Sequence, residues 1–291
     1  MEFALDVLRF IHYAAALQLF GVGVFQGLLA PAGLRRHLDG SSRALALPCA
    51  WLLLSSAIAL LALMAGTMGE GWADAANPAV LFLVLRATAF GAVWSFHLIL
   101  ALLLVLILSF RSEEKWRLTT LLATLALGSL GLIGHATIGV GAVGIVSRTS
   151  QVLHLLASGF WIGSLGPLLF CLRAMLAGEH EASARVALQR FSGFGHVAVA
   201  IVIATGAANG WLLLRDTGLD VTSLYQQLLL AKISIVGIMI VFAIVNRYVF
   251  MPAIASGGRG LNQLRLGTIA EIVLSGGVIG LVSILGALSP S

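Results

Sequence analysis

The sequence predicts an all-α, polytopic membrane protein, and two observations carry this prediction. The chain has 291 residues, of which 59% are hydrophobic and only 10% are charged, whereas a soluble domain is usually about 45–50% apolar and about 25% charged. Apolar stretches of about 20 residues, each long enough to cross roughly 30 Å of hydrocarbon as a helix, recur along the whole chain. We therefore predict one integral domain over residues 1–291, embedded in the lipid bilayer.

The apolar stretches predict a bundle of eight spanning helices. These cover residues 5–30, 44–66, 88–110, 116–138, 148–174, 191–214, 223–249 and 265–288. A polar segment after the second span leads into a short interfacial helix that starts near Pro78. The first and fifth spans share a histidine nine residues before a glycine, which predicts a weak parallel repeat of four helices, residues 1–138 and 148–288. Chance explains so short a pattern equally well.

The distribution of Lys and Arg predicts the orientation in the membrane. Most basic residues lie in the odd-numbered connections, namely Arg35, Arg36, Arg43, Arg111, Lys115, Arg117, Arg173, Arg185, Arg190, Arg247, Arg259 and Arg265. Those connections should be cytoplasmic, which places both termini on the outer, periplasmic side of a bacterial inner membrane. The net charge of +5 is explained in this way, and no basic patch with interleaved aromatic residues predicts nucleic-acid binding.

The fifth span has two unlike faces. At 100° per residue, His154, Ser158, Trp161 and Leu165 share one face of the helix. Gly159, Gly163 and Gly166 lie on nearly the opposite face, where small residues allow another helix to approach closely. The pattern predicts a tight packing seam on one side and a histidine presented on the other.

Three histidines are predicted at similar depth below the outer surface. His12 and His154 lie about 10 Å down their helices at 1.5 Å per residue, His135 lies at a similar or shallower level, and His97 lies deeper, near the middle. One buried histidine alone is as often hydrogen-bonded to a neighbouring helix as it is a ligand. Neutral imidazole binds copper, zinc and haem iron, so we predict a metal site at His135, His154 and His12.

Further residues are predicted to support that site. They are Trp161, His97, Gly131 and Ser158, with Gly131 allowing a partner helix to come close beside His135. Met64 and Met68, four residues apart at the outer end of the second span, carry thioethers that favour Cu(I), although lipid-facing or gap-filling methionines are the commoner case.

Other sulfur and charged groups leave alternatives open. Cys49 and Cys171, near the cytoplasmic ends of their helices, could form an exit station for a soft ion, or they are simply small buried residues. Lys232 and Glu271 are predicted to pair with each other, because an unpaired charge at that depth would be costly.

Several of these residues resemble a known family. The segments "GHATIG" and "HLLASGFWIGSLGPLLFCLR", followed by "RFSGFGHVAVAIVIATGAANGWLLL", "LLLAKISIVGIMIVFAIVNRYVFMP" and a last helix ending in "LGALSP", are similar to the copper resistance protein D (CopD/PcoD) family. The resemblance implies an eight-helix inner-membrane protein that handles copper, usually described as copper uptake from the periplasm. It also implies that His135, His154 and Trp161 matter most.

Two functions remain open at this stage. The first is a copper permease that receives Cu(I), more readily than Cu(II), from a periplasmic copper-binding protein and moves it toward the cytoplasm. The second is an electron-transfer protein that holds non-covalent haem b between two histidines on neighbouring helices. No nucleophile–base pair or paired carboxylates lie at a common depth, so we do not expect an enzyme.

Overall fold

The computed structural model describes residues 1–110, 115–133, 141–218, 220, 222–255 and 260–288, and all regular structure in these ranges is helical. The elements are α1 (Glu2–Val24), η1 (Phe25–Leu29), α2 (Ala32–Met68), α3 (Trp72–Ala75), α4 (Pro78–Ala87), α5 (Ala89–Ser109), α6 (Lys115–Leu130), α7 (Gly141–Leu176), α8 (Glu181–Thr217), α9 (Leu224–Val245), η3 (Asn246–Phe250), α10 (Met251–Ala255) and α11 (Gly260–Leu285). The predicted all-α polytopic membrane fold is confirmed.

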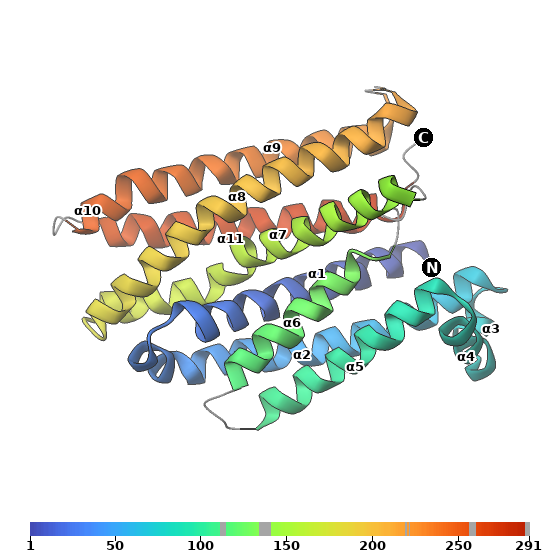
Figure 1. Cartoon of the computed structure of the whole chain (residues 1–291), viewed down its shortest axis with the longest axis horizontal. Helices are drawn as coiled ribbons and strands as arrows, with labels where there is room; N and C mark the ends of the chain where they lie inside the picture. Colours follow the sequence, from blue (N-terminus) through green and yellow to red (C-terminus); the bar gives the residue numbers. More distant parts are fainter. Residues whose placement is uncertain (111–114, 134–140, 219, 221, 256–259, 289–291) are drawn as a thin grey trace.

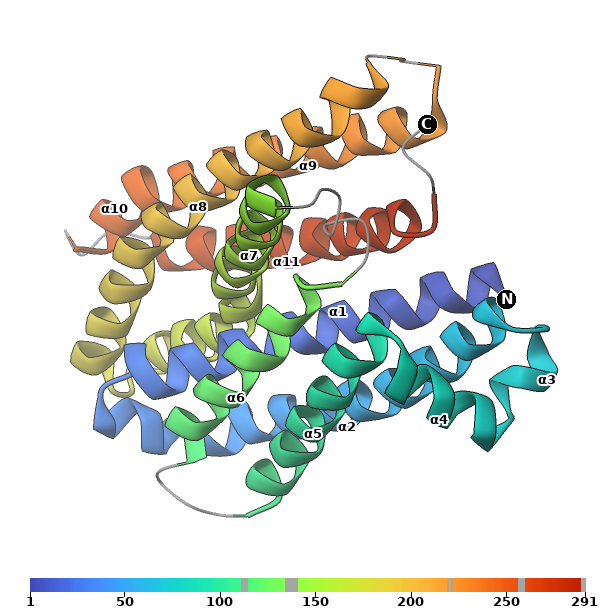
Figure 2. The ribbon, with the colours of Figure 1, turned by 45° about the vertical axis from the view of Figure 1, so that its right-hand side comes forward.

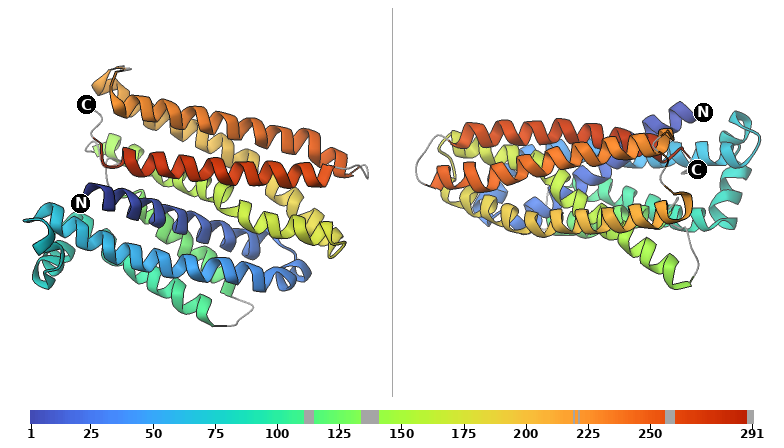
Figure 3. Two further views of the ribbon diagram at one scale, coloured as in Figure 1. Left: turned by 180° about the vertical axis from the view of Figure 1, so that it is seen from behind. Right: turned by 90° about the horizontal axis from the view of Figure 1, so that it is seen from above.

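Seven of the described helical stretches are long and apolar enough to cross a membrane. The other predicted span corresponds to α6, of which 16 residues are described, and α6 packs against α1 and α5 within the same bundle. The count of eight crossings therefore stays a prediction, as does the parallel repeat. The start of α1 and the end of α11 lie at the same end of the bundle (Figure 1; Figure 3).

The helices form two groups on either side of a central pair, α1 and α7 (Figure 1). Helices α2, α5 and α6 pack together on one side, and α8, α9 and α11 lie on the other. Helix α1 packs against α2, α6, α7 and α11, whereas α7 packs against α1, α8, α6 and α11. The short helices α3 and α4 project from the end of the bundle near the start of α1 (Figure 2).

The central pair is held by the predicted glycine seam. A Cβ atom added at Gly163 would overlap the Leu17 carbonyl, and one added at Gly21 would overlap the Gly163 backbone. The Gln18 side chain donates a hydrogen bond to the Gly163 carbonyl at 2.7 Å, and the Ser164 hydroxyl donates one to the Gly21 carbonyl at 3.2 Å. The backbones of α1 and α7 can approach this closely only because neither residue carries a side chain.

Several helices begin earlier than the sequence predicts. Helix α2 begins at Ala32 rather than 44, α7 at Gly141 rather than 148, and α8 at Glu181 rather than 191. In the first turns of α2 the residues buried are Leu34, Leu38 and Ser42, at helical spacing. Hydropathy marks the part of a helix that crosses lipid, so it misses the polar first turns of α2 and α8. The first turns of α7, GAVGIVS, are apolar, and their glycines led to the prediction of a connection there.

We predict that Gly163→Ala destabilises the protein through overpacking, by about 1–3 kcal/mol or more. The readout is the midpoint of thermal unfolding in detergent. Gly237→Ala is the matched control, because an added Cβ at Gly237 meets nothing within 4 Å and alanine is the better helix former. Equal midpoints for the two variants would contradict the seam.

Candidate metal site

Two buried histidines lie side by side between α1 and α5. His12 is 2% exposed and His97 is 0% exposed, and their ring centroids are 4.9 Å apart with a tilt of 49°. That His97 lies deeper in the membrane than His12 stays a prediction. Counting residues from a predicted helix start ignores how far neighbouring helices are shifted along their axes, so it did not predict that these two rings meet.

The Ser56 hydroxyl on α2 is the hydrogen-bond partner of His12. Its Oγ lies 2.8 Å from His12 Nδ1 and 2.5 Å from the Leu52 carbonyl, which can only accept. With the hydroxyl hydrogen donated to that carbonyl, Ser56 accepts from the ring, and His12 carries its hydrogen on Nδ1 and its lone pair on Nε2.

His97 is oriented by partners on α6. Its Nδ1 lies 3.2 Å from the Ala126 carbonyl, which is only an acceptor, and 2.9 Å from the Ser129 Oγ on α6. The Ser129 hydroxyl donates to the Ala126 carbonyl at 2.8 Å. His97 therefore also carries its hydrogen on Nδ1 and has a lone pair on Nε2.

Both Nε2 atoms are buried and have no hydrogen-bond partner in the described part of the chain. A metal-binding histidine normally donates its other ring hydrogen to a fixed partner that orients the ring, which is how Ser56 and Ser129 hold these two rings. Trp94 packs 5.2 Å from the His97 ring and 5.4 Å from the His12 ring, and it donates to the Ala57 carbonyl. The arrangement can offer two neutral nitrogen ligands to a cation.

His154 lies on the other side of the central pair. Its Nδ1 is 2.9 Å from the Thr205 Oγ1 on α8, while the glycine face of α7 packs against α1. The predicted division of α7 into a glycine face and a histidine face is thus confirmed. The same division keeps His154 on the α8 side of α7, so the structure does not bring it to His12. Ser158 lies one turn along α7 and is half-buried.

His135, the third predicted ligand, lies outside the described residues. Gly131 is described at the end of α6, and a Cβ added there would lie 2.9 Å from the Val152 backbone nitrogen. Helix α6 therefore approaches α7 closely just before His135, as predicted. His135 itself stays a predicted ligand.

The sulfur groups lie apart from the histidine pair. Met64 is half-buried and Met68 is 52% exposed at the end of α2, about 12 Å and 18 Å along the helix from Ser56 at 1.5 Å per residue. Cys171 is fully buried and its thiol lies 3.6 Å from the Ala184 carbonyl, whereas Cys49 is partly buried. Within the described residues, no three His, Cys, Asp or Glu side chains form a metal-binding group.

A second buried polar cluster surrounds Glu271 on α11. Trp161 Nε1 donates to Glu271 Oε2 at 2.9 Å, and Asn246 Nδ2 donates to Glu271 Oε1 at 2.7 Å. Asn246 begins the π-helical turn η3, a distortion that is frequent at functional sites. The three side chains line a cavity of about 450 Å³ between α7, α8, α9 and α11. The predicted pairing of Glu271 with Lys232 was wrong: the carboxylate bonds to Trp161 and Asn246, and no ion pair joins it to Lys232 among the described residues.

Comparison with known proteins identifies the family. A family model described as "Copper resistance protein D-like, N-terminal domain" matches residues 1–145, and one described as "Copper resistance protein D" matches residues 185–285. The chain is 34% identical to Inner membrane protein YebZ of Escherichia coli (strain K12), covering 100% of this chain and 99% of that relative. The chain belongs to the copper resistance protein D family. The expected family membership is thus confirmed.

Two further relatives of this copper resistance protein D family member are more distant. Copper resistance protein D of Pseudomonas syringae pv. tomato is 28% identical, with 100% of this chain and 98% of that relative covered. Copper transport protein CutJ of Bacillus subtilis (strain 168) is 28% identical over 73% of this chain and 39% of its own length. No solved structure matches the chain.

The side chains that orient the two histidine rings were not predicted from the sequence. Ser56 and Ser129 orient the two rings, and Trp94 packs on both of them. Trp94 precedes His97 by three residues, which places both on one face of α5 and could have drawn attention to it. The two serines carry no such signal, because serine is common in membrane helices and only the packing shows its partner.

We predict that Glu271→Gln is tolerated and that Glu271→Ala is not. The glutamine oxygen can accept from Trp161, and its amide can donate to Asn246 Oδ1, which is buried without a partner, after the Asn246 amide turns over. Alanine leaves the Trp161 and Asn246 donors unpaired beside a void, at a cost of roughly 2–4 kcal/mol. Thermal unfolding in detergent measures both, and an equal loss in the two variants would contradict this geometry.

Proposed function

We propose that the protein is an inner-membrane copper permease, and that His12 and His97 receive Cu(I) on its way through the bundle. The proposed role is to bind and transport copper, not to catalyse a reaction. The copper-related names of its relatives support the choice of metal. The histidine pair supports the position, because both Nε2 atoms are buried without a hydrogen-bond partner and the two ring centroids are 4.9 Å apart.

The unpartnered nitrogens are the observation that carries the proposal. A buried polar atom without a hydrogen bond costs about 1–3 kcal/mol, and here two such atoms lie in neighbouring rings. Their Nδ1 hydrogens are already donated to fixed acceptors, so the rings cannot satisfy each other with a hydrogen bond between the Nε2 atoms. A cation that accepts both lone pairs removes both costs at once.

The donor set favours Cu(I) over other ions. Zinc in proteins is almost always four-coordinate in structural sites, whereas Cu(I) forms stable complexes with two neutral nitrogen donors. The absence of a carboxylate among the described ligands also suits a singly charged ion. With metal–nitrogen distances of about 2 Å, two opposed imidazoles would have their centroids farther apart than 4.9 Å, so binding requires the two rings to move apart.

A route through the protein follows from the positions of the softer groups. Met64 and Met68 lie beyond Ser56 toward the end of α2 that is predicted to face the periplasm, and the Met1 methyl also approaches α2 there, near Gly66. These thioethers would take Cu(I) from a periplasmic copper-binding protein before it reaches the histidines. His154 and His135 remain candidate ligands for a separate step, and Cys49 and Cys171 remain candidates for the exit.

The alternative, haem b held by two histidines, fits this pair less well. A porphyrin between His12 and His97 would need space for a large flat ring on every side of the iron. The Trp94 indole stacks on His97 at 5.2 Å with an interplanar angle of 18°, and it occupies part of that space. A visible absorption spectrum of the purified protein separates the two proposals, because only haem gives a Soret band.

We predict that His12→Gln and His97→Gln each abolish binding of one equivalent of Cu(I) to the purified protein. Binding is measured by elemental analysis after loading with Cu(I) under reducing conditions. His196→Gln is the matched control, because His196 is exposed and bonded to Tyr248. His154→Ala tests the ligand predicted from the sequence.

The outcomes of this experiment separate the sites. Loss of copper in the His12 and His97 variants, with retention in His154→Ala and in the control, supports the pair. Loss only in His154→Ala would move the site to the α8 side of α7. Unchanged copper in all folded variants would refute a histidine site among the described residues.

A further inference from the structure

A second, larger cavity lies at the end of the bundle where α2 begins and α5 gives way to α6. It has a volume of about 770 Å³. Its lining residues are Ala32, Arg35, Arg36, Asp39, Gly40, Arg43, Ala44, Leu47, Pro48, Lys115 and Trp116. Copper handling at the histidine pair uses none of them.

The described lining of this cavity is strongly positive. It contains three arginines and Lys115, but Asp39 is its single acidic residue. Lys115 is paired with Asp39 at 2.8 Å, so the charge of each is neutralised by the other. The three arginine charges remain without a carboxylate partner in the described part of the chain. A cavity of this kind attracts an anion.

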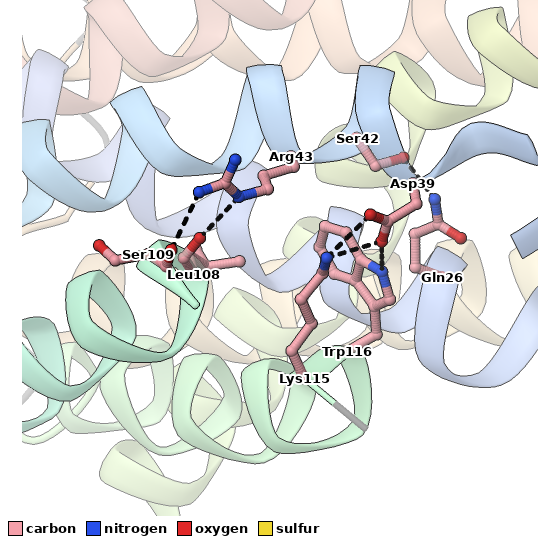
Figure 4. Close-up of polar contacts among 8 residues, drawn as sticks. All are labelled: Gln26, Asp39, Ser42, Arg43, Leu108, Ser109, Lys115 and Trp116. Atoms are coloured by element: carbon pink, nitrogen blue, oxygen red, sulfur yellow. Dashed lines mark hydrogen bonds and ion pairs between the residues drawn. The ribbon is translucent and has the colours of Figure 1, made fainter. Parts of the chain in front are cut away.

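Hydrogen bonds fix the side of the cavity where α2 meets α5 and α6 (Figure 4). Arg43 donates to the Leu108 and Ser109 carbonyls at the end of α5, at 2.9 Å and 3.0 Å. Asp39 accepts from Lys115 and from Trp116 Nε1, the latter at 2.7 Å. These bonds tie α2 to α5 and α6, so the cavity is held open by the fold.

Arg35 and Arg36 line the cavity and have guanidinium N–H groups available to donate hydrogen bonds to a ligand. Arg35 makes one long bond, from Nη2 to the Ala30 carbonyl at 3.3 Å, and its Nε is buried with no partner. Arg36 is exposed. Both arginines line the cavity, and a guanidinium group suits a phosphate, because it can donate two parallel hydrogen bonds to the phosphate oxygens.

The inner part of the cavity is apolar. Ala44, Leu47 and Pro48 follow the arginines along α2, and Trp51 and Leu52 continue that surface with exposed fractions of 55% and 47%. A ligand that places its phosphate among the arginines would therefore lay any attached acyl chain along α2. Free phosphate is also an anion, but it has no acyl chain that would contact this apolar surface.

We propose that this cavity binds the phosphate headgroup of an anionic phospholipid. The cavity lies at the end of the bundle predicted to be cytoplasmic, where basic pockets between membrane helices commonly bind acidic lipids. The bound lipid would bridge α2, α5 and α6. It would thereby stabilise α2 and α6, the helices that carry Ser56 and Ser129. This inference is independent of whether the histidine pair binds copper.

The test uses native mass spectrometry of the full-length protein in mixed micelles. Phosphatidylglycerol and phosphatidylcholine of equal chain length are supplied in equal amounts, and the bound lipid is identified by mass. Arg35→Gln/Arg36→Gln is compared with Arg173→Gln/Arg185→Gln, which makes the same charge change outside the cavity lining. Arg43 is left intact because it holds α5, and Glu113 and Glu114 are unchanged in both variants.

We expect the wild type and the control to retain phosphatidylglycerol in preference to phosphatidylcholine. The Arg35→Gln/Arg36→Gln variant should bind phosphatidylglycerol at least about tenfold more weakly, because it removes two of the three arginine charges that attract the anionic headgroup. Equal retention in the two variants, or no preference for the anionic lipid in the wild type, would overturn the proposal.

A separate arm distinguishes lipid from free phosphate. Dioctanoyl and dioleoyl forms of phosphatidylglycerol are compared, and millimolar inorganic phosphate is added as a competitor. Tighter binding of the longer lipid and resistance to phosphate support the phospholipid. Equal binding of both chain lengths, with displacement by phosphate, would assign the cavity to a free phosphate and overturn the lipid assignment.

Discussion

In the hydrocarbon core of a membrane, each polar atom must find its partner within the protein. Many buried side chains of the described residues meet this requirement, through bonds such as those from Trp161 and Asn246 to Glu271. Eight buried side-chain atoms of the described residues do not. Two of these eight, the Nε2 atoms of His12 and His97, lie in adjacent rings, and the account of copper binding depends on that adjacency.

The glycine seam between α1 and α7 fixes the orientation of the helix that carries His12. Because Gly21 and Gly163 let the two backbones meet, α1 is held with His12 turned toward α2 and α5 and away from α7. The same seam turns the opposite face of α7, with His154 and Trp161, toward α8 and α11. One close packing contact thus divides the polar groups into two clusters, the histidine pair and the Glu271 cavity.

Most of the fold could be predicted from the sequence, because long apolar stretches and glycine spacing act locally along one helix. The long apolar helices, the short helix at Pro78 and the two faces of α7 are of this kind, and the family resemblance rested on ordered motifs in consecutive helices. Which histidines meet could not be predicted in the same way. That depends on how far α1 and α5 are shifted and rotated relative to each other, and no feature of either helix alone records this.

The central claim is that His12 and His97 together bind one Cu(I) ion through their Nε2 atoms. X-ray absorption spectroscopy of the copper-loaded protein tests it most directly, because the technique reports the number and type of atoms bound to the metal. The account predicts a low-coordinate Cu(I) spectrum with two imidazole nitrogens, lost in the His12→Gln and His97→Gln variants. A first shell made only of sulfur, or a spectrum unchanged in those variants, would contradict it.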